Sequence, residues 1–209
     1  GDNNNYKYDP EVAFPNNKII DPNKSYKLEF NGHKLNINKK TFGRKSKILF
    51  EYENDTLFAY NPFIEAMKNF EINFLINNDS IGQYLSRKNY DGSYSFVTNK
   101  IIDSYYQFKT KSLGKFYIDY DTIAPSIVRN KRVDYKKQIQ YYIKDKETGI
   151  KNYEGKINNQ WALFEYEPKL SKIFFNNDTL IKKNKINRIE IKVNDLVGNS
   201  TTVIDSLQF

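Results

Sequence analysis

The feature that most constrains this chain is the recurrence of apolar and aromatic residues at every second position. This pattern is clear at residues 26–30, 72–76, 139–143 and 189–193. A period of two places one row of side chains in a core and the other in solvent, as in antiparallel strands. Residues 62–70 alone have near-helical spacing, and the segment is too short for an independent helix, so we expect a turn or short crossover. The pattern predicts an all-β fold.

The composition also favours strands. The chain contains 17 Tyr and 15 Phe, and aromatic side chains suit the pleated, half-buried surface of a strand. Asparagine, which serves turns well, is abundant, and alanine is scarce. The absence of cysteine excludes a disulfide framework, a thiolate metal site and a cysteine nucleophile. No apolar run approaches the roughly 20 residues of a membrane-spanning helix, so no transmembrane segment is expected.

The net charge of +8 raises the question of a nucleic-acid partner. Lysines are scattered through the predicted strands and turns and are interleaved with acidic residues, with only a short cluster at residues 182–185. A nucleic-acid-binding protein concentrates its positive charge on one face or in one arm. We therefore expect solvated, lysine-rich strand faces and no nucleic-acid partner.

The clearest domain boundary lies at residues 119–125, where a predicted strand ends in acidic residues and Pro125 forces extended backbone. We expect a lead-in segment at 1–23, a β-sandwich domain at 24–120 and a second at 121–209. Sandwiches of about 100 residues bury a sufficient core. The predicted architecture is two tandem antiparallel, immunoglobulin-like β-sandwiches.

Four short motifs occur in a fixed order around this boundary and in the second domain. They are DTIAP at 121–125, DKETGI at 145–150, INNQWALFEY at 157–166 and NDLVGNS at 194–200. In this order they resemble the C-terminal region of Gram-negative cell-envelope proteins, in which a lysostaphin-type zinc endopeptidase domain precedes immunoglobulin-like domains. The resemblance covers roughly residues 25–205. It implies an envelope protein outside the cytoplasm, in the periplasm or at the outer membrane and cell surface.

The catalytic part of that resemblance is missing from this chain. The zinc peptidase needs an H-x-x-x-D and an H-x-H motif to hold zinc and activate water, whereas this chain has one histidine, His33. The resemblance therefore implies either the non-catalytic tail of such a protein, with a peptidase domain upstream in the same polypeptide, or a relative that never carried the peptidase. No catalytic residue is assigned, and the chain is not expected to be an enzyme.

Other chemistry has weak support in the sequence. His33 follows Asn31 and Gly32, so we interpret it as a surface residue of a hairpin turn; no nucleophile motif accompanies it. Two carboxylate pairs, Glu51 with Glu53 and Glu165 with Glu167, have the spacing that puts both groups on one face of a strand. A solvated face explains each pair more simply than glycoside hydrolysis does.

Four aspartates at predicted strand ends are candidate Ca²⁺ ligands: Asp119, Asp121, Asp145 and Asp195. Ca²⁺ takes several oxygen ligands from carboxylates, carbonyls and water. Aspartate also caps turns through local hydrogen bonds, and the glycines that follow Asp145 and Asp195 favour this second role. We favour turn capping and expect no cofactor.

Trp161, the only tryptophan, is the leading candidate for ligand binding, together with Tyr153 and Tyr166. If exposed, its indole could stack on a sugar ring; if buried, it would be a large core residue of a sandwich. Alternation places Ala162, Phe164 and Tyr166 on the more apolar face, opposite Trp161. We nevertheless favour packing in the core or between domains.

The sequence thus predicts a non-catalytic binding or spacer module of a bacterial envelope protein. An envelope protein or cell-wall glycan is the expected partner, and the basic surface suits acidic envelope polymers. Two alternatives stay open: a stand-alone surface lipoprotein or adhesin-like module, and a glycan-active enzyme on a β scaffold.

Overall fold

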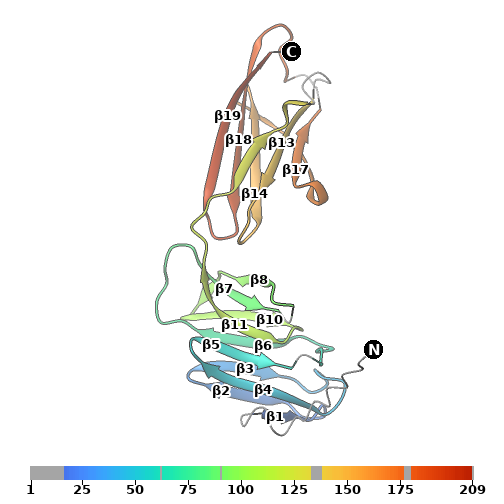
Figure 1. Ribbon diagram of the computed structural model, residues 1–209, viewed down its shortest axis with the longest axis vertical. Helices are drawn as coiled ribbons and strands as arrows, with labels where there is room; N and C mark the ends of the chain where they lie inside the picture. Colours follow the sequence, from blue (N-terminus) through green and yellow to red (C-terminus); the bar gives the residue numbers. More distant parts are fainter. Residues whose placement is uncertain (1–16, 62, 90, 133–137, 177–179, 209) are drawn as a thin grey trace, which may run out of the picture. The chain divides into compact units, whose positions relative to one another are not determined.

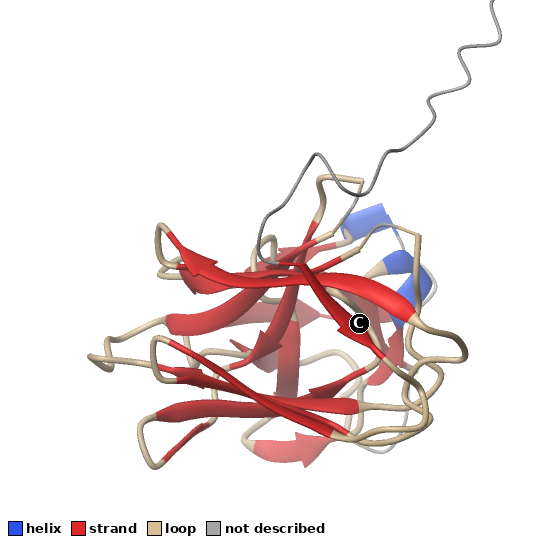
Figure 2. Ribbon diagram, turned by 90° about the horizontal axis from the view of Figure 1, so that it is seen from below, coloured by secondary structure: helices blue, strands red, loops and turns tan. Residues whose placement is uncertain are grey.

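A computed structural model of the chain describes residues 17–61, 63–89, 91–132, 138–176 and 180–208. Over these residues the protein is all-β, with four antiparallel sheets, none of them closed (Figures 1 and 2). The chain divides after Asp119 into two compact units, which we call the first unit and the second unit. In the described part of the chain, no helix is long and apolar enough to span a membrane.

The first unit contains two sheets. Its strands are β1 (Asn17–Ile20), β2 (Tyr26–Phe30), β3 (His33–Ile37), β4 (Ser46–Glu53), β5 (Thr56–Tyr60), β6 (Phe70–Leu75), β7 (Gln83–Lys88), β8 (Tyr94–Thr98), β9 (Ile101–Ile102), β10 (Tyr105–Thr110) and β11 (Gly114–Tyr120). One sheet has the order β1-β4-β5-β11-β7-β8, and the other has the order β2-β3-β6-β10-β9. Side chains from both sheets meet in one core, which includes Leu35, Phe50, Phe74 and Phe116. Since each sheet buries one face on the other, the unit is compatible with a β-sandwich.

The second unit is built in the same way from sheets with fewer strands. Its strands are β12 (Ser126–Arg129), β13 (Ile139–Lys144), β14 (Ile150–Ile157), β15 (Gln160–Ala162), β16 (Glu165–Glu167), β17 (Lys172–Phe175), β18 (Ile186–Asp195) and β19 (Ser200–Gln208), with a 3-10 turn at Pro168–Leu170. The sheet orders are β12-β13-β17-β16 and β15-β14-β18-β19. The inward residues Tyr141, Ile173, Ile189 and Ile191 contribute to a single core. This unit is also compatible with a β-sandwich.

The strands follow the alternation in the sequence. In β18, buried side chains occur at every second position from Asn187 to Asp195, and the residues between them are more exposed. β6 shows the same pattern. Residues 63–69 contain no helix and connect β5 to β6, which lie in different sheets, so the expected short crossover is confirmed.

The expected lead-in segment is wrong at its C-terminal end. Residues 17–20 form β1, which pairs with β4, and Ile20 is buried in the core of the first unit. The pairing satisfies backbone hydrogen bonds along the edge of the sheet, which explains why this short segment is ordered with the domain. The remainder of that expected segment, residues 1–16, lies outside the described residues. The division between units falls one residue before the expected boundary.

Candidate functional site

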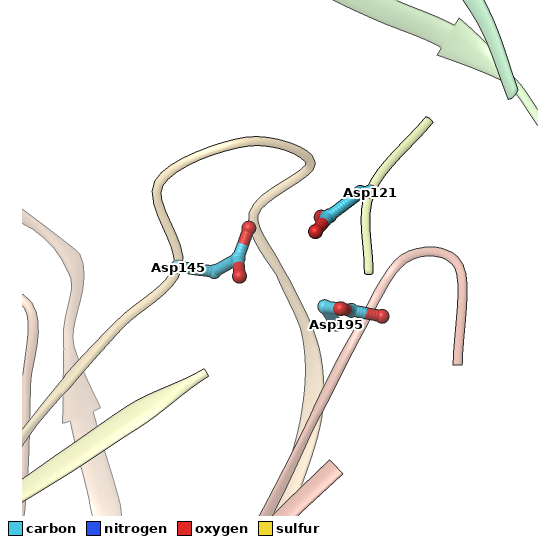
Figure 3. Close-up of side chains that lie close together, drawn as sticks. All are labelled: Asp121, Asp145 and Asp195. Atoms are coloured by element: carbon cyan, nitrogen blue, oxygen red, sulfur yellow. The ribbon is translucent and has the colours of Figure 1, made fainter. Parts of the chain in front are cut away.

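Three of the four predicted aspartates come together at one end of the second unit (Figure 3). Asp121 follows β11, Asp145 follows β13, and Asp195 ends β18. One carboxylate oxygen from each lies within 4.8 Å of the others. Asp121 and Asp195 are buried, and Asp145 is half-buried. Asp119 is not part of this group, which we call the aspartate cluster; its carboxylate lies within 3.3 Å of the Tyr84 hydroxyl, which donates to it.

The loop between β13 and β14 donates hydrogen bonds to both Asp145 and Asp121. The backbone N–H groups of Thr148 and Gly149 donate to Asp145 Oδ2 at 2.8 and 2.6 Å. The Thr148 hydroxyl donates to Asp121 Oδ2 at 2.7 Å, and the Ile123 N–H donates to Asp121 Oδ1 at 3.0 Å. These bonds tie the segment before β12 to the β13–β14 loop.

Asp195 closes the β18–β19 hairpin. Its Oδ1 accepts backbone N–H groups from Val197, Gly198 and Asn199 at 3.0, 2.6 and 2.8 Å. The Asn199 side-chain amide donates to Asp195 Oδ2 at 2.8 Å and to the Asp121 carbonyl at 3.0 Å. Gly198 has φ +104°, a left-handed conformation that glycine adopts without a Cβ penalty. The hairpin is thus fixed by its own aspartate.

The aspartate cluster can act in two ways. Three carboxylates at this separation are a partial ligand set for a divalent cation such as Ca²⁺. Each carboxylate, however, already accepts at least two hydrogen bonds from the protein, which compensates the cost of burying charge. The hydrogen bonds support the turn-capping role that the sequence analysis favoured. That analysis missed Thr148, although this residue lies within the DKETGI motif.

Trp161 lies on the surface of the second unit rather than in its core. Its side chain is 64% exposed, which contradicts the expected core packing. The reason is the inward direction of its neighbours: Ala162 and Phe164 are buried, and the Phe164 ring covers Gly155, where a Cβ would lie 2.2 Å from the ring. Because adjacent strand residues point to opposite faces, Trp161 points outward.

The outward face of this sheet carries a mixed row of side chains. Trp161 on β15 pairs with Lys156 on β14, Lys156 with Glu190 on β18, and Glu190 with Ile204 on β19. Directly paired residues share a face of an antiparallel sheet. Lys156 forms an ion pair with Glu154 at 3.3 Å, and Arg188 forms one with Glu190 at 2.6 Å. We call this surface, an exposed indole beside paired charges, the Trp161 face.

Tyr153 and Tyr166 form a separate pair, with ring centroids 5.8 Å apart. The Tyr153 hydroxyl donates to the Phe164 carbonyl at 2.8 Å. Burial, and then the neighbouring Tyr166, raises the pKa of the Tyr153 phenol above its ordinary value. Tyr153 packs against the core and Tyr166 is 40% exposed. The hydrogen bond from Tyr153 fixes the backbone at Phe164, and the structure shows no contact of either tyrosine with Trp161 among the described residues.

His33 is buried, and its expected surface position is wrong. The side chain is 2% exposed and packs between the rings of Tyr52 and Phe74, at centroid distances of 4.1 and 4.5 Å. Its Nδ1 accepts the Leu75 backbone N–H at 3.0 Å. Burial lowers the pKa of His33 to about 4. The imidazole is therefore neutral at physiological pH and has a structural role.

The two carboxylate pairs lie on strand faces that point away from the cores. Glu51 and Glu53 alternate with the core residues of β4, and Glu165 and Glu167 flank Tyr166 on β16. Glu167 pairs with Lys172 and Glu165 with Phe174 across the sheet. This arrangement agrees with solvated faces.

The comparisons with known proteins add no assignment. No protein-family model matches the sequence, and no curated protein matches it.

Proposed function

We propose that this chain is a non-catalytic binding and spacer module of a bacterial cell-envelope protein, and that the Trp161 face binds cell-wall glycan. The proposal includes two tandem immunoglobulin-like domains, a location outside the cytoplasm, and an upstream peptidase domain in the same polypeptide. The last two elements rest on the order of the four sequence motifs.

The strand order of the second unit supports its immunoglobulin-like part. If β12 to β19 are read in sequence as A, B, C, C′, D, E, F and G, the two sheets have the orders A-B-E-D and C′-C-F-G. These are the orders of an immunoglobulin-type sandwich with an added C′ strand. The first unit has two larger sheets with another order, so its immunoglobulin-like character rests on its face-to-face sheets alone.

The surroundings of the titratable groups support a non-catalytic role. His33 is held between two aromatic rings in the core of the first unit. Proton transfer needs a group within hydrogen-bond reach of a substrate, which a side chain 2% exposed does not offer. The carboxylates of the aspartate cluster accept loop N–H groups, which makes them structural.

The exposed indole of Trp161 is the observation that carries the binding proposal. Burying a large aromatic side chain on a ligand is favourable because it removes apolar area from water. Lys156, directly opposite Trp161, and Glu190, on the next strand, supply a donor and an acceptor for sugar hydroxyls. A sugar ring offers both an apolar face and polar edges, so it matches this surface.

The test is co-sedimentation of the full chain with purified peptidoglycan sacculi, together with the fluorescence of Trp161. We expect binding, a change in indole emission, and a loss of about tenfold in affinity for Trp161→Ala, equivalent to about 1.4 kcal/mol. Leu163→Ala is the matched control, because Leu163 is 63% exposed, close to Trp161 in sequence, and not aromatic.

Three results would contradict the proposal. Equal losses of affinity for Trp161→Ala and Leu163→Ala would indicate nonspecific apolar adhesion. A failure of the chain to bind sacculi would exclude cell-wall glycan as the ligand. Release of reducing sugar, abolished by Glu165→Gln, would favour a glycan-active enzyme. Immunoblots of fractionated source cells test separately whether this chain is the tail of a larger envelope protein. We expect a band in the envelope fraction well above the 24.8 kDa of this chain, whereas a band at that mass would favour a stand-alone lipoprotein.

A further inference from the structure

We propose that the second unit associates with a second copy of this chain through the open edge of β19, in an antiparallel strand pair centred on Ile204. The sheet of one copy then continues into the sheet of the other, which is how uncovered edge strands bind another strand. The length, charge, backbone phase and sequence of β19 carry this inference.

β19 is the longest edge strand among those that the structure describes. It forms one end of the β15-β14-β18-β19 sheet and contains nine residues, whereas the other strands at sheet edges contain two to five (Figure 1). Short edge strands and lysine side chains are common protections against edge-to-edge pairing. β19 has neither, since none of the 33 Lys and Arg residues of the chain lies within Ser200–Gln208.

The backbone groups of Thr202, Ile204 and Ser206 face the open edge. In an antiparallel ladder, hydrogen-bonded pairs of residues alternate with pairs that are not hydrogen-bonded. The Asp195 N–H donates to the Asn199 carbonyl at 3.0 Å, so these two residues are a hydrogen-bonded pair at the β18–β19 hairpin. Counted along the register from there, every even-numbered residue of β19 belongs to a pair that is not hydrogen-bonded, and its N–H and C=O point away from β18.

The other side of β18 gives the same phase. The Asn158 N–H donates to the Arg188 carbonyl at 2.8 Å, so the backbone of Arg188 faces β14. Arg188 is opposite Ser206, and this pair is therefore not hydrogen-bonded. Among the described residues, none forms a backbone hydrogen bond with the open edge of β19. The Pro125 carbonyl accepts from the Thr201 hydroxyl, which is a side-chain contact and does not use the edge backbone.

A second copy of β19 is complementary to this edge. Ile204 is the middle residue of the strand, so an antiparallel pair centred on it engages the whole strand of both copies and joins even-numbered residues to even-numbered residues. Ile204 then faces Ile204 of the second copy, and Thr202 faces Ser206, which places an apolar contact between two pairs of hydroxyls. Ile204 is 57% exposed, so its side chain has apolar area to bury in this contact.

The single charged residue of β19 favours the same register. Asp205 is half-buried, and its Oδ2 accepts the Tyr141 hydroxyl at 2.8 Å. In the pair centred on Ile204, each Asp205 is opposite Val203 of the other copy. A pair centred on Asp205 would place two carboxylates opposite each other, and like charges in that position destabilise a strand pair.

The pairing has a consequence for the Trp161 face. It joins two four-stranded sheets into one sheet of eight strands, and directly paired residues share a face of an antiparallel sheet, so the Trp161 faces of both copies lie on the same side. Two binding faces on one side allow a dimer to bind a polymer at two points. This consequence rests on the proposed glycan binding, whereas the self-association does not.

The test is sedimentation equilibrium of the full chain in the absence of glycan. Strand pairing with one apolar contact makes a small interface, so we expect a Kd on the order of 100 μM. The mean mass should rise from 24.8 kDa towards twice that value between about 10 μM and about 1 mM chain. Ile204→Lys should raise the Kd by about tenfold or more, since it places two positive charges opposite each other at the centre of the pair. Leu163→Lys is the matched control, because Leu163 is 63% exposed in the same unit and lies outside β19; its Kd should equal that of the unchanged chain.

Cysteine cross-linking tests the register, because the chain contains no Cys. With copper–phenanthroline as the oxidant, Ile204→Cys should form a disulfide-linked dimer, since facing residues of a hydrogen-bonded pair have Cα atoms about 5.5 Å apart. Ser206→Cys changes the same face of the same strand, but its two thiols would lie four residues apart along the pair, about 14 Å, which is beyond the reach of a disulfide. It should remain monomeric on a denaturing gel.

Circular dichroism verifies that each variant is folded, and all the substituted side chains are exposed. Three results would each overturn the proposal. They are a constant mass of 24.8 kDa up to about 1 mM chain, equal effects of Ile204→Lys and Leu163→Lys on the Kd, and equal cross-linking of Ile204→Cys and Ser206→Cys.

Discussion

The two units of this protein are built alike but bury their polar groups differently. Each packs two antiparallel sheets around one core. In the second unit, the buried polar side chains Asp195 and Asn187 lie at the ends of β18 and bond to loop backbone. In the first unit, His33 is inserted among core aromatic rings. Both units use buried polar groups to fix loops, as Asn61 does at the Phe63 N–H in the first unit, but only the first also places one among the aromatic rings of its core, among the residues that the structure describes.

Asn187 shows how complete this loop fixation is in the second unit. Its amide nitrogen donates to the carbonyls of Lys182 and Lys185, and its oxygen accepts from the Lys182 N–H and the Asn158 amide. The hydrogen bonding of buried polar side chains is less complete in the first unit, where Thr41 Oγ1 and Gln83 Nε2 are buried without a hydrogen-bond partner among the described residues. Buried groups without partners lower stability. We therefore expect mutations of the polar groups to separate the two units experimentally.

The largest effect is expected for Asp195→Ala in the second unit. The change leaves three backbone N–H groups and the Asn199 amide without their acceptor. We expect a loss of about 3 kcal/mol in the free energy of unfolding, since each unsatisfied buried group costs about 1–3 kcal/mol and the loop recovers some water contacts. Denaturant-dependent hydrogen exchange with mass spectrometry would locate the loss in peptides of the second unit.

Glu154→Ala is the control for this prediction. Glu154 lies on the exposed face of β14 and forms an ion pair with Lys156, and exposed pairs contribute little. We expect almost no change in the unfolding free energy. If Asp195→Ala cost no more than Glu154→Ala, the hairpin would not depend on its aspartate, and the contrast between the units would fail.

The alternation of the sequence correctly predicted the strands at residues 26–30, 72–76, 139–143 and 189–193, because burial on one face imposes a period of two. The same alternation indicates the buried position of His33, because His33 lies on the same face of β3 as the buried Leu35 and Ile37. The turn signal of Asn31 and Gly32 misled the prediction, since a residue beside a turn can still point inward. For Trp161, the alternation that places it on the face opposite Ala162 and Phe164 predicted its position better than the preference for large residues in cores did.

The aspartate cluster needed information that alternation does not contain. Each aspartate could be placed at a strand end from sequence, but only the order of the strands brings Asp121, Asp145 and Asp195 to one end of the unit. The short strand β1 was missed because four residues at an edge carry too little periodicity.

A smaller effect, confined to the first unit, is expected from the pH dependence of His33. Its folded pKa of about 4 lies below the ordinary histidine value of about 6.5, so the unfolded chain binds the proton more readily. The contribution of neutral His33 to the free energy of unfolding is therefore fully present above about pH 6.5 and is lost as the pH falls toward 4. Between pH 7.5 and 5.5 we expect a loss of about 1 kcal/mol, measured by denaturant unfolding with hydrogen exchange in peptides of the first unit.

His33→Gln provides the control, because glutamine offers an acceptor near the Leu75 N–H but does not titrate. The variant should be less stable at every pH and should lack this part of the pH dependence. An unchanged slope in the first unit would mean that another group titrates there, and that His33 only fills space.

The smallest effect is expected from Ca²⁺. A bound ion would compete with the loop N–H groups for the carboxylate oxygens of the aspartate cluster, and the three N–H groups on Asp195 Oδ1 present positive dipoles that repel a cation there. Ca²⁺ also needs six or more oxygen ligands. We therefore expect calorimetry to give the same unfolding midpoint for the second unit in about 5 mM Ca²⁺ and in chelator, since a ligand stabilises only as far as its concentration exceeds its Kd.

A rise in the midpoint that Asp145→Asn removed would contradict turn capping, because Asp145 is the half-buried member of the cluster and its exposure gives an ion access. The contrast between the units would then be one between a core histidine and a metal-stabilised set of loops.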